Sequence, residues 1–508
     1  MHDERTLPVS EKPWVASDRD AYPDTVHFRG LNTPVGIEAS VPGLTVEGTL
    51  PSGLEGSFFR AVPDPAHPPM FADDNILSGD GMISRFRFRK GAVDFDIRYV
   101  QTARYLAEQH AGRALFGGYR NPFTDHPSVA ETDRTVANTT PLWHAGRLFM
   151  TKEDGLPYEI DPDTLATKGA CDFDGALRSQ TVTAHSRVDP ETGELFLFGY
   201  EADGACSRDV SYAVLDPRGH LMREQWFKQP YHGMIHDFAI TRSRAILPFF
   251  PTTTDLDRLR AGGPKWAHDQ NLECCVGIMG RDGDVAGMRW FKGAKGASAF
   301  HIMNAFDEGD VVHLDLFVSE TNAFGFMREA GGIHIDQRAI RGGFERWTFD
   351  LAGEGEHFTV TPLGPPGDMP RIRDADCGRD YKTGWYLSMN PQGGPPLPGG
   401  PVGAAFNCLI RITLPHGEID MLALPPGHAV SEPVHVPATE PNGSDWLLCI
   451  VDKANGDAGF QSELWVLDAD RPSRGPIARV HVPLPLRAQV HGCWVPATVQ
   501  SQASQMTR

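Results

Sequence analysis

The sequence lacks long apolar runs and contains little cysteine. No stretch of about 18 apolar residues occurs in the 508 residues, so we expect no membrane-spanning helix. The first residues, MHDERTLPVSEKPW, are charged and have no apolar core of a secretory signal. The eight cysteines include no C-x-x-C pair, which is typical of reduced thiols rather than a disulfide framework. Together these features predict a cytoplasmic protein.

Positive charge is also in deficit. The formal net charge is −19 and the isoelectric point is near 5.5. Nucleic acids and anionic lipid surfaces both require a basic face on their protein partner. The composition therefore argues against a nucleic-acid partner and against docking on an anionic membrane.

Helical periodicity is scarce, and short β-like segments are frequent. The best helical candidates are residues 103–116 and 253–262. The 53 glycines and 41 prolines are spread along the chain, where they separate short apolar or alternating runs. Typical runs are GRLFMTKED, GELFLFGYE, RAILPFFPT, CCVGIMG, DVVHLDLFVSE, GWYLSMN, CLIRITL and DWLLCIVDK. The pattern predicts an all-β fold.

Chain length favours a β-propeller over other all-β folds. A sandwich or small barrel uses about 100–250 residues, whereas some seven blades of about 40–65 residues would use this whole chain. The blades must be divergent, because no strict repeat such as a WD motif occurs. We expect an extended arm over 1–45, a seven-bladed catalytic propeller over 46–496 with short helices and loops capping one face, and a tail over 497–508.

Four histidines share one local context, beside an apolar strand and a turn: His185, His236, His301 and His491. The first three are each separated by about one blade length, and the last by about three. Since radial repeats bring equivalent strands to a common axis, we predict that these four imidazoles converge there. Four imidazoles suit zinc, copper, nickel or iron, so the ligands alone do not name the metal.

Most of the 20 histidines are expected at the surface or in the core, where they bind no metal. His232 lies four residues before His236, but QPYHGMIHDF contains proline and glycine, so a helical pair is not expected. His435, in EPVHVP, is interpreted as a packing residue.

The strings around the four histidines resemble the histidine motifs of the carotenoid cleavage oxygenases. They are TAHSRVDPETGELFLFGY, MIHDFAIT, FHIMNAFDEGD and HGCWVP, and LSGDGMISRFRF resembles that family's early glycine-rich strand. The matches follow the family order over nearly the whole chain. The resemblance implies a seven-bladed propeller with one Fe(II) per chain, held by four neutral histidines, and O2 as cosubstrate.

The family also places three glutamates behind its histidines, where they fix ring orientation. Two positions match, Glu153 and Glu432, and the third is Asp368, which is one methylene shorter. At Asp368 we expect an inward shift of the backbone, a bridging water or a more loosely held histidine. The family threonine near the open coordination position is assigned here to Thr139.

The strings FGGYRNPFTDHPSV and FMTKEDGLPYEIDP resemble the stilbene-cleaving branch, the lignostilbene dioxygenases. That resemblance implies that Tyr119 and Lys152 hold the substrate's 4-hydroxyl group. If Lys152 and Glu153 lie in a strand, they point to opposite faces, one to the substrate and one to a ligand. The branch often stacks an aromatic ring near DDNILSGDGM, where this chain has Ile76 and Leu77.

Three readings of function follow from these observations. The first is an iron dioxygenase that cleaves the central C=C bond of a 4-hydroxystilbene into two aromatic aldehydes. The second is the same chemistry on an apocarotenoid, which needs a long apolar tunnel rather than a phenol site. The third is a binding scaffold, since fold does not imply function. We expect a small aromatic or apolar alkene as substrate, and the oligomeric state is open between monomer and homodimer.

Overall fold

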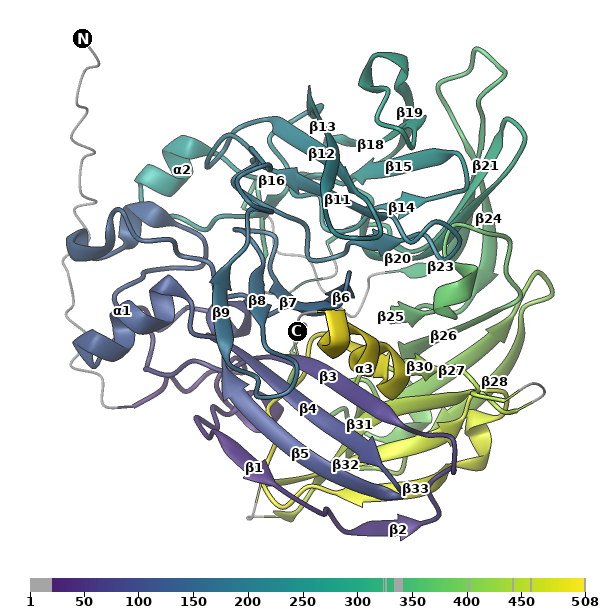
Figure 1. Ribbon diagram of the computed structural model, residues 1–508. Coiled ribbons are helices and arrows are strands. Elements are labelled where there is room, and N and C mark those ends of the chain that lie inside the picture. The colour runs from purple at the N-terminus through teal and green to yellow at the C-terminus, as the bar shows by residue number, and fades with distance from the viewer. Residues whose placement is uncertain are drawn as a thin grey trace.

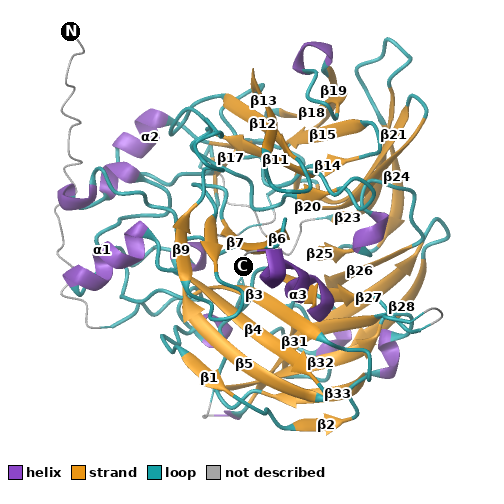
Figure 2. Ribbon diagram, viewed as in Figure 1, coloured by secondary structure: helices purple, strands orange, loops and turns teal. Residues whose placement is uncertain are grey.

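The computed structural model describes residues 21–506 except 323, 325–326, 333–340, 401–402, 441–442 and 457–458. Strands account for most of its regular structure and helices for little (Figure 2), so the predicted all-β class is confirmed. Residues 1–20 of the predicted arm lie outside the described part. Within that part, no helix is long and apolar enough to cross a membrane.

Among the residues that the structure describes, seven sheets have four or more strands and an eighth is smaller. In spatial order, the first comprises β1 (Ala39–Val41), β5 (Ala92–Tyr99), β4 (Gly81–Arg89), β3 (Gly56–Pro63) and β34 (Gly492–Pro496). The second comprises β6 (Thr140–His144), β7 (Arg147–Thr151), β8 (Tyr158–Ile160) and β9 (Thr167–Ala170). The third comprises β10 (Arg187–Val188), β11 (Leu195–Tyr200), β12 (Asp209–Leu215) and β13 (Leu221–Lys228).

The remaining sheets follow in chain order. The fourth comprises β14 (Ala239–Ile240), β15 (Arg244–Phe249), β18 (Glu273–Gly280) and β19 (Arg289–Lys295). The fifth comprises β20 (Ser298–Glu308), β21 (Val311–Ser319), β23 (Gly342–Asp350) and β24 (Thr359–Gly364). The sixth comprises β25 (Asp368–Arg371), β26 (Thr383–Ser388), β27 (Cys408–Thr413) and β28 (Glu418–Ala423).

The seventh large sheet comprises β2 (Val46–Gly48), β33 (Pro476–His481), β32 (Phe460–Asp468), β31 (Trp446–Ala454) and β29 (His428–Val430), with β30 (Val434–Val436) also pairing with β31. The small sheet comprises β16 (Thr252–Thr253), β17 (Ala267–His268) and β22 (Arg328–Glu329). The strand pairs within the large sheets are antiparallel.

The large sheets surround a common centre (Figure 1). Strands β6, β14, β20 and β25 lie near this centre, while β13, β19, β24 and β28 lie at the rim. Central strands of neighbouring sheets contact one another, including β14 with β20, β20 with β25, and β34 with β6. The chain closes this arrangement by pairing β3 with β34, which joins residues near 60 to residues near 492.

Strands in the interior of these sheets, such as β11, are apolar on both faces because each sheet packs between two others. In β11, Leu195 and Leu197 pack into one cluster with Phe149 of β7. Their neighbours Phe196 and Phe198 pack into a different cluster, which includes residues of the fourth sheet. Continuous burial on two sides therefore explains why LFLF is an uninterrupted apolar run.

Two short helices lie within the segments predicted to be helical, residues 103–116 and 253–262. Helix α1 (Ala103–Ala111) begins after Thr102, whose hydroxyl accepts the Tyr105 amide, and stops where Gly112 adopts φ 65°. Helix α2 (Leu256–Arg260) begins after Asp255, which caps the Arg258 amide. A third helix, α3 (Ala497–Met506), occupies the segment expected to be a tail. The division into arm, propeller and tail stays a prediction, although β1 of the expected arm pairs with β5.

Candidate metal centre and substrate cavity

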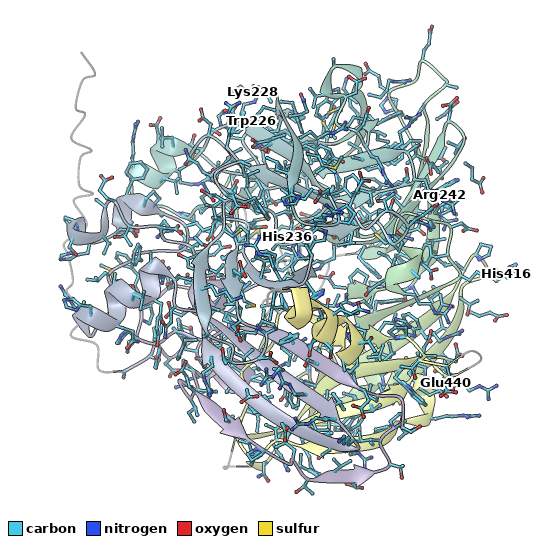
Figure 3. The ribbon with its side chains drawn as sticks, viewed as in Figure 1. Trp226, Lys228, His236, Arg242, His416 and Glu440 are labelled. Atoms are coloured by element: carbon cyan, nitrogen blue, oxygen red, sulfur yellow. The ribbon has the colours of Figure 1, made fainter. Side chains whose placement is uncertain are left out.

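The four predicted histidines lie at the central ends of four different sheets. His185 and His236 come shortly before β10 and β14, His301 lies in β20, and His491 directly precedes β34. Figure 3 shows His236 near the middle of the molecule, whereas Lys228, Arg242, His416 and Glu440 project at its rim. The topology thus brings together side chains that are far apart in sequence.

The four imidazole rings form one cluster. The Nε2 atom of His236 lies 3.1 Å from Nε2 of His185 and 3.2 Å from Nε2 of His301. One ring nitrogen from each of these three residues lies within 4.8 Å of the others. The ring of His491 completes the group, with its centroid 4.7 Å from that of His185 and 5.0 Å from that of His301.

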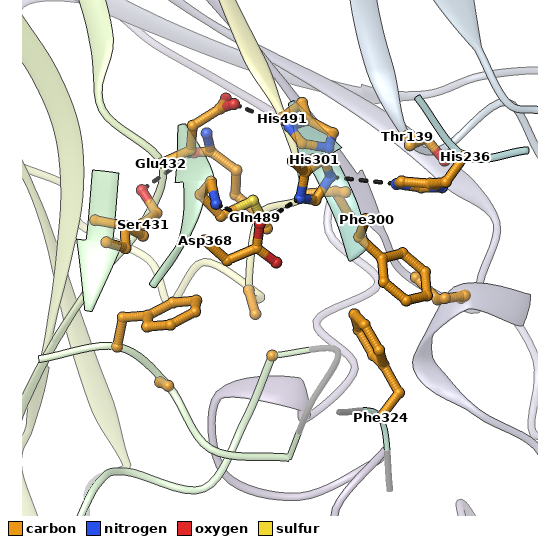
Figure 4. Close-up of a pocket in the computed structure, with 18 of the residues that line it drawn as sticks. Thr139, His236, Phe300, His301, Phe324, Asp368, Ser431, Glu432, Gln489 and His491 are labelled. Atoms are coloured by element: carbon orange, nitrogen blue, oxygen red, sulfur yellow. Dashed lines mark hydrogen bonds and ion pairs between the residues drawn. The ribbon is translucent and has the colours of Figure 1, made fainter. Parts of the chain in front are cut away.

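A carboxylate contacts the outer nitrogen of three of these rings. Nδ1 of His236 lies 3.0 Å from Glu153 Oε2, and Nδ1 of His491 lies 2.9 Å from Glu432 Oε1. Nδ1 of His301 lies 2.7 Å from Asp368 Oδ1 (Figure 4). An ionised carboxylate only accepts hydrogen bonds, so each Nδ1 donates and each Nε2 presents its lone pair to the cluster.

The short side chain of Asp368 reaches His301 directly, without an intervening water. The register between β25 and β26 shifts at Asp368, and the next residue, Met369, adopts φ 55°. The Met369 amide also donates to Asp368 Oδ1 at 2.8 Å. Of the three expected outcomes, the structure therefore shows the shorter carboxylate in direct contact, at an irregularity in the edge strand.

The cluster has the donor set of a cation site. Burial lowers the pKa of His185 and His491, which favours the neutral imidazoles that ligate metals. The buried Nε2 of His491 has no hydrogen-bond partner. Lone pairs that face each other across about 3 Å repel unless a cation lies between them, so the residues present fit a metal ion bound by imidazole.

An apolar cavity adjoins the cluster. His236, His301 and His491 line it, and Phe300 and Phe324 form one wall with ring centroids 3.9 Å apart. His185 instead lines a second, more polar cavity that also reaches His301 and His491. The imidazoles therefore separate an apolar compartment from a polar one.

The predicted phenol-binding residues line the apolar cavity together. Lys152 Nζ lies 5.4 Å from the centre of the Tyr119 ring and donates to Asn138 Oδ1 at 3.2 Å. Thr139 also lines the cavity, and its hydroxyl donates to the same Asn138 oxygen at 3.0 Å. Burial lowers the pKa of Lys152 and raises that of Tyr119. This end of the cavity therefore combines a buried amine with a protonated phenol.

The separation of Lys152 from Glu153 does not come from strand alternation. Strand β7 ends at Thr151, so both residues lie in the following turn, and both line the cavity. Lys152 extends to Asn138 while Glu153 extends to His236. Of the two apolar candidates, Leu77 lines the cavity, whereas the buried Ile76 does not belong to the lining.

Arg120 forms a buried ionic network that the sequence motifs did not indicate. Its guanidinium contacts Glu153 at 3.2 Å and Glu201 at 3.3 Å, and Lys265 also pairs with Glu201. Arg120 also donates to the Tyr200 hydroxyl. No local pattern predicts this network, because its charged members come from turns and loops that are distant in sequence. It fixes Glu153, which in turn orients His236.

The two histidines expected to stay outside the cluster have other partners. Nδ1 of His232 lies 2.6 Å from the carbonyl of Cys206. Nε2 of His435 lies 3.0 Å from Asp445, and its ring stacks on Trp385 with centroids 5.3 Å apart. Neither residue lines the two cavities that meet the cluster.

Comparison with known proteins places these features in context. The family model described as retinal pigment epithelial membrane protein matches residues 32–496. Lignostilbene-alpha,beta-dioxygenase isozyme III of Sphingomonas paucimobilis is 39% identical over 94% of this chain and 98% of its own length. Isoeugenol monooxygenase of Pseudomonas nitroreducens is 38% identical over 92% of this chain and 97% of its own. The crystal structure of Pseudomonas brassicacearum lignostilbene dioxygenase superposes with a TM-score of 0.89 at 38% identity, covering 94% of this chain and 100% of that one.

Proposed function

We propose that this chain is an iron-dependent dioxygenase that cleaves a 4-hydroxystilbene. The chain belongs to the retinal pigment epithelial membrane protein family, which includes the carotenoid cleavage oxygenases. The reaction adds both atoms of O2 across the central C=C bond and gives two aromatic aldehydes. We assign seven propeller blades to the seven large sheets, and a cap of short helices and loops to the cavity side. The cytoplasmic location and the oligomeric state stay predictions.

The buried Lys152 beside Tyr119 is the observation that carries this proposal. A long apolar polyene has no group for an amine to bind, whereas a phenol has one. Burial lowers the pKa of Lys152, which eases loss of a proton from its amine; the amine can then accept the phenolic proton and stay beside the phenolate as an ammonium. Tyr119, whose own pKa is raised by burial, keeps its proton and donates a hydrogen bond to the same oxygen.

The histidines and their carboxylates would form the metal site. His185, His236, His301 and His491 would hold one Fe(II), which supplies the activation of O2 when bound. Glu153, Asp368 and Glu432 hold the proton of each Nδ1 in place, so that every Nε2 stays available as a ligand. Phe300 and Phe324 keep water from the alkene. The phenolate supplies electron density to the double bond through the conjugated chain.

A substrate comparison tests the proposal. Oxygen uptake is measured with 4-hydroxystilbene, isoeugenol and an apocarotenal, and the products are identified as aldehydes. We expect 4-hydroxystilbene to be cleaved with the highest kcat/KM. Preferred cleavage of the apocarotenal would contradict the phenol site. Preferred cleavage of isoeugenol, whose alkene carries no second ring, would support the phenol site but contradict a stilbene as the substrate. Metal analysis should show about one iron per chain.

A further inference from the structure

The apolar cavity contains polar side chains that the proposed reaction does not use. Besides the imidazoles, their carboxylates, Thr139, Trp266 and the phenol pair, its described lining includes three residues whose polar side chains can form hydrogen bonds: Ser431, Asp452 and Gln489. They come from the end of β29, from β31 and from the segment before β34. A polar group in an apolar wall is costly unless it is paired, so these residues need an explanation.

These residues lie across the imidazoles from the phenol end. Figure 4 shows Ser431 and Glu432 on one side of the cluster and Phe300 and Phe324 on the other. Tyr119 and Phe300 both pack against the hydrophobic cluster that contains Phe324. Gln489 is drawn between Ser431 and the imidazoles, so a substrate that extends from Tyr119 past the imidazoles reaches Gln489 and then Ser431 (Figure 4).

Gln489 has an unused donor. Its Oε1 accepts from Arg60 Nε at 2.5 Å and from the Ser431 hydroxyl at 3.5 Å. Its Nε2 is buried and has no hydrogen-bond partner, and the whole residue is 6% exposed. Since a buried amide donor without a partner costs about 1–3 kcal/mol, this arrangement is consistent with a bound acceptor oxygen.

Asp452 supplies an acceptor in the lining of the same cavity. Its Oδ1 accepts the Ser462 hydroxyl at 2.6 Å, and the charge of the fully buried Arg60 favours its ionised form. Burial raises the pKa of Asp452 to about 6, so the carboxyl is mostly ionised at neutral pH. A hydroxyl group can accept from Gln489 and donate to a carboxylate, whereas a methoxy group can only accept.

We propose that Gln489, with Ser431 and Asp452, forms a second polar subsite that binds a phenolic hydroxyl on the far ring of the substrate. The inference rests on the proposed cleavage of a 4-hydroxystilbene and narrows its substrate class to stilbenes with oxygen on both rings. Gln489 acts here as a specificity residue that contacts the substrate away from the double bond.

The test compares far-ring substituents within one enzyme. We expect kcat/KM for 4,4′-dihydroxystilbene to exceed that for 4-hydroxystilbene by about three- to tenfold, the effect of one neutral hydrogen bond. In Gln489→Met this ratio should fall to about one. Gln489→Glu keeps an acceptor for Arg60 and replaces the amide donor, so 4-hydroxy-4′-methoxystilbene should become a poorer substrate than 4-hydroxystilbene. If Gln489→Met does not fold, Gln489→Glu still tests the subsite.

A matched control and a binding measurement separate the subsite from a purely structural role. Gln229 is also buried with an unpartnered side chain, but it does not line the cavity, so Gln229→Met should leave the substrate ratio unchanged. Quenching of the cavity residue Trp266 reports binding in protein with and without iron. An unchanged ratio in both Gln489 variants would overturn the subsite. If no phenolic alkene were cleaved, the proposed function would be wrong. The subsite would still be tested by whether the protein binds 4,4′-dihydroxystilbene more tightly than 4-hydroxystilbene.

Discussion

His301 and Asp368 are joined by a contact of 2.7 Å between Nδ1 and Oδ1, although the aspartate is one methylene shorter than the glutamates behind His236 and His491. The irregular pairing of β25 and the left-handed backbone of Met369 accompany this contact. The shorter side chain therefore reaches its imidazole at the expense of regular backbone rather than through a water.

This contact predicts that Asp368→Ala weakens iron binding about ten- to a hundredfold, the range typical of lost partners behind a metal ligand. Asp368→Glu should also weaken binding, but less, because the longer chain keeps a carboxylate in a site shaped for a shorter one. Iron affinity is measured by competition with a chelator. Wild-type affinity in both variants would show that the contact is incidental.

The ligand assignment predicts that His301→Ala loses the iron. His435→Ala is the matched control, because His435 is an equally buried histidine in a strand but is bonded to Asp445 away from the cluster. Metal analysis of both purified variants, with circular dichroism to verify folding, checks the prediction. Iron retained in His301→Ala would contradict the assignment.

The phenol site predicts a loss of about a hundredfold or more in 4-hydroxystilbene cleavage for Lys152→Met, with iron content unchanged. General base and charge effects of one positioned side chain are of this size. Oxygen uptake measures the rate. The loss should be much smaller with a stilbene that has no 4-hydroxyl, because no phenolic proton is then involved; equal losses on both substrates would show a structural role.

The ionic network predicts that Arg120→Met destabilises the fold by about 3–5 kcal/mol, because it removes the guanidinium that the buried Glu153 contacts and leaves Glu201 paired with Lys265 alone. Thermal unfolding measures the change. Lys292→Met, which breaks an exposed pair with Glu356, is the control and should leave the melting temperature unchanged. A stable Arg120→Met protein would mean that the network can relax around the loss.

Asp452 predicts a pH dependence of stability. Burial raises its pKa from 3.8 to about 6, so the folded protein keeps a proton that the unfolded chain releases between these values. This contribution to stability is complete below about pH 4 and is lost as the pH rises through 6, a change of about 3 kcal/mol. Asp452→Asn should therefore gain stability relative to the wild type between pH 4 and 7 in calorimetric scans. Asp257→Asn, at an exposed site, is the control for the substitution itself.

Much of the fold follows from local sequence, and what does not follow depends on tertiary contacts. Apolar runs between turns, such as LFLFGY, predict strands because both of their faces are buried between sheets. The end of α1 is predicted five residues too late, because the glycine at position 112 stops the helix. Helix α3 has no clear apolar period and contacts β3 and β34, so packing rather than pattern specifies it.

The histidine cluster could be predicted from the sequence because its members recur at blade-like intervals beside strands. Arg120, Gln489 and Asp452 were not, because their partners are distant in sequence and carry no spacing signal. Arg120 contacts Glu201, and Gln489 contacts Arg60 across the closing sheet. Such networks can be identified only from the tertiary structure, which brings their members into contact.

The pairing of β3 with β34 also bears on the order of events in biosynthesis. His491 directly precedes β34, so the fourth imidazole reaches its place only after that strand docks onto a partner translated more than four hundred residues earlier. A nascent chain still on the ribosome can gather three of the rings but not the complete set. If the rings bind iron as proposed, we expect full loading with metal only after the ring of sheets has closed, and not in an incomplete protein whose centre is still open.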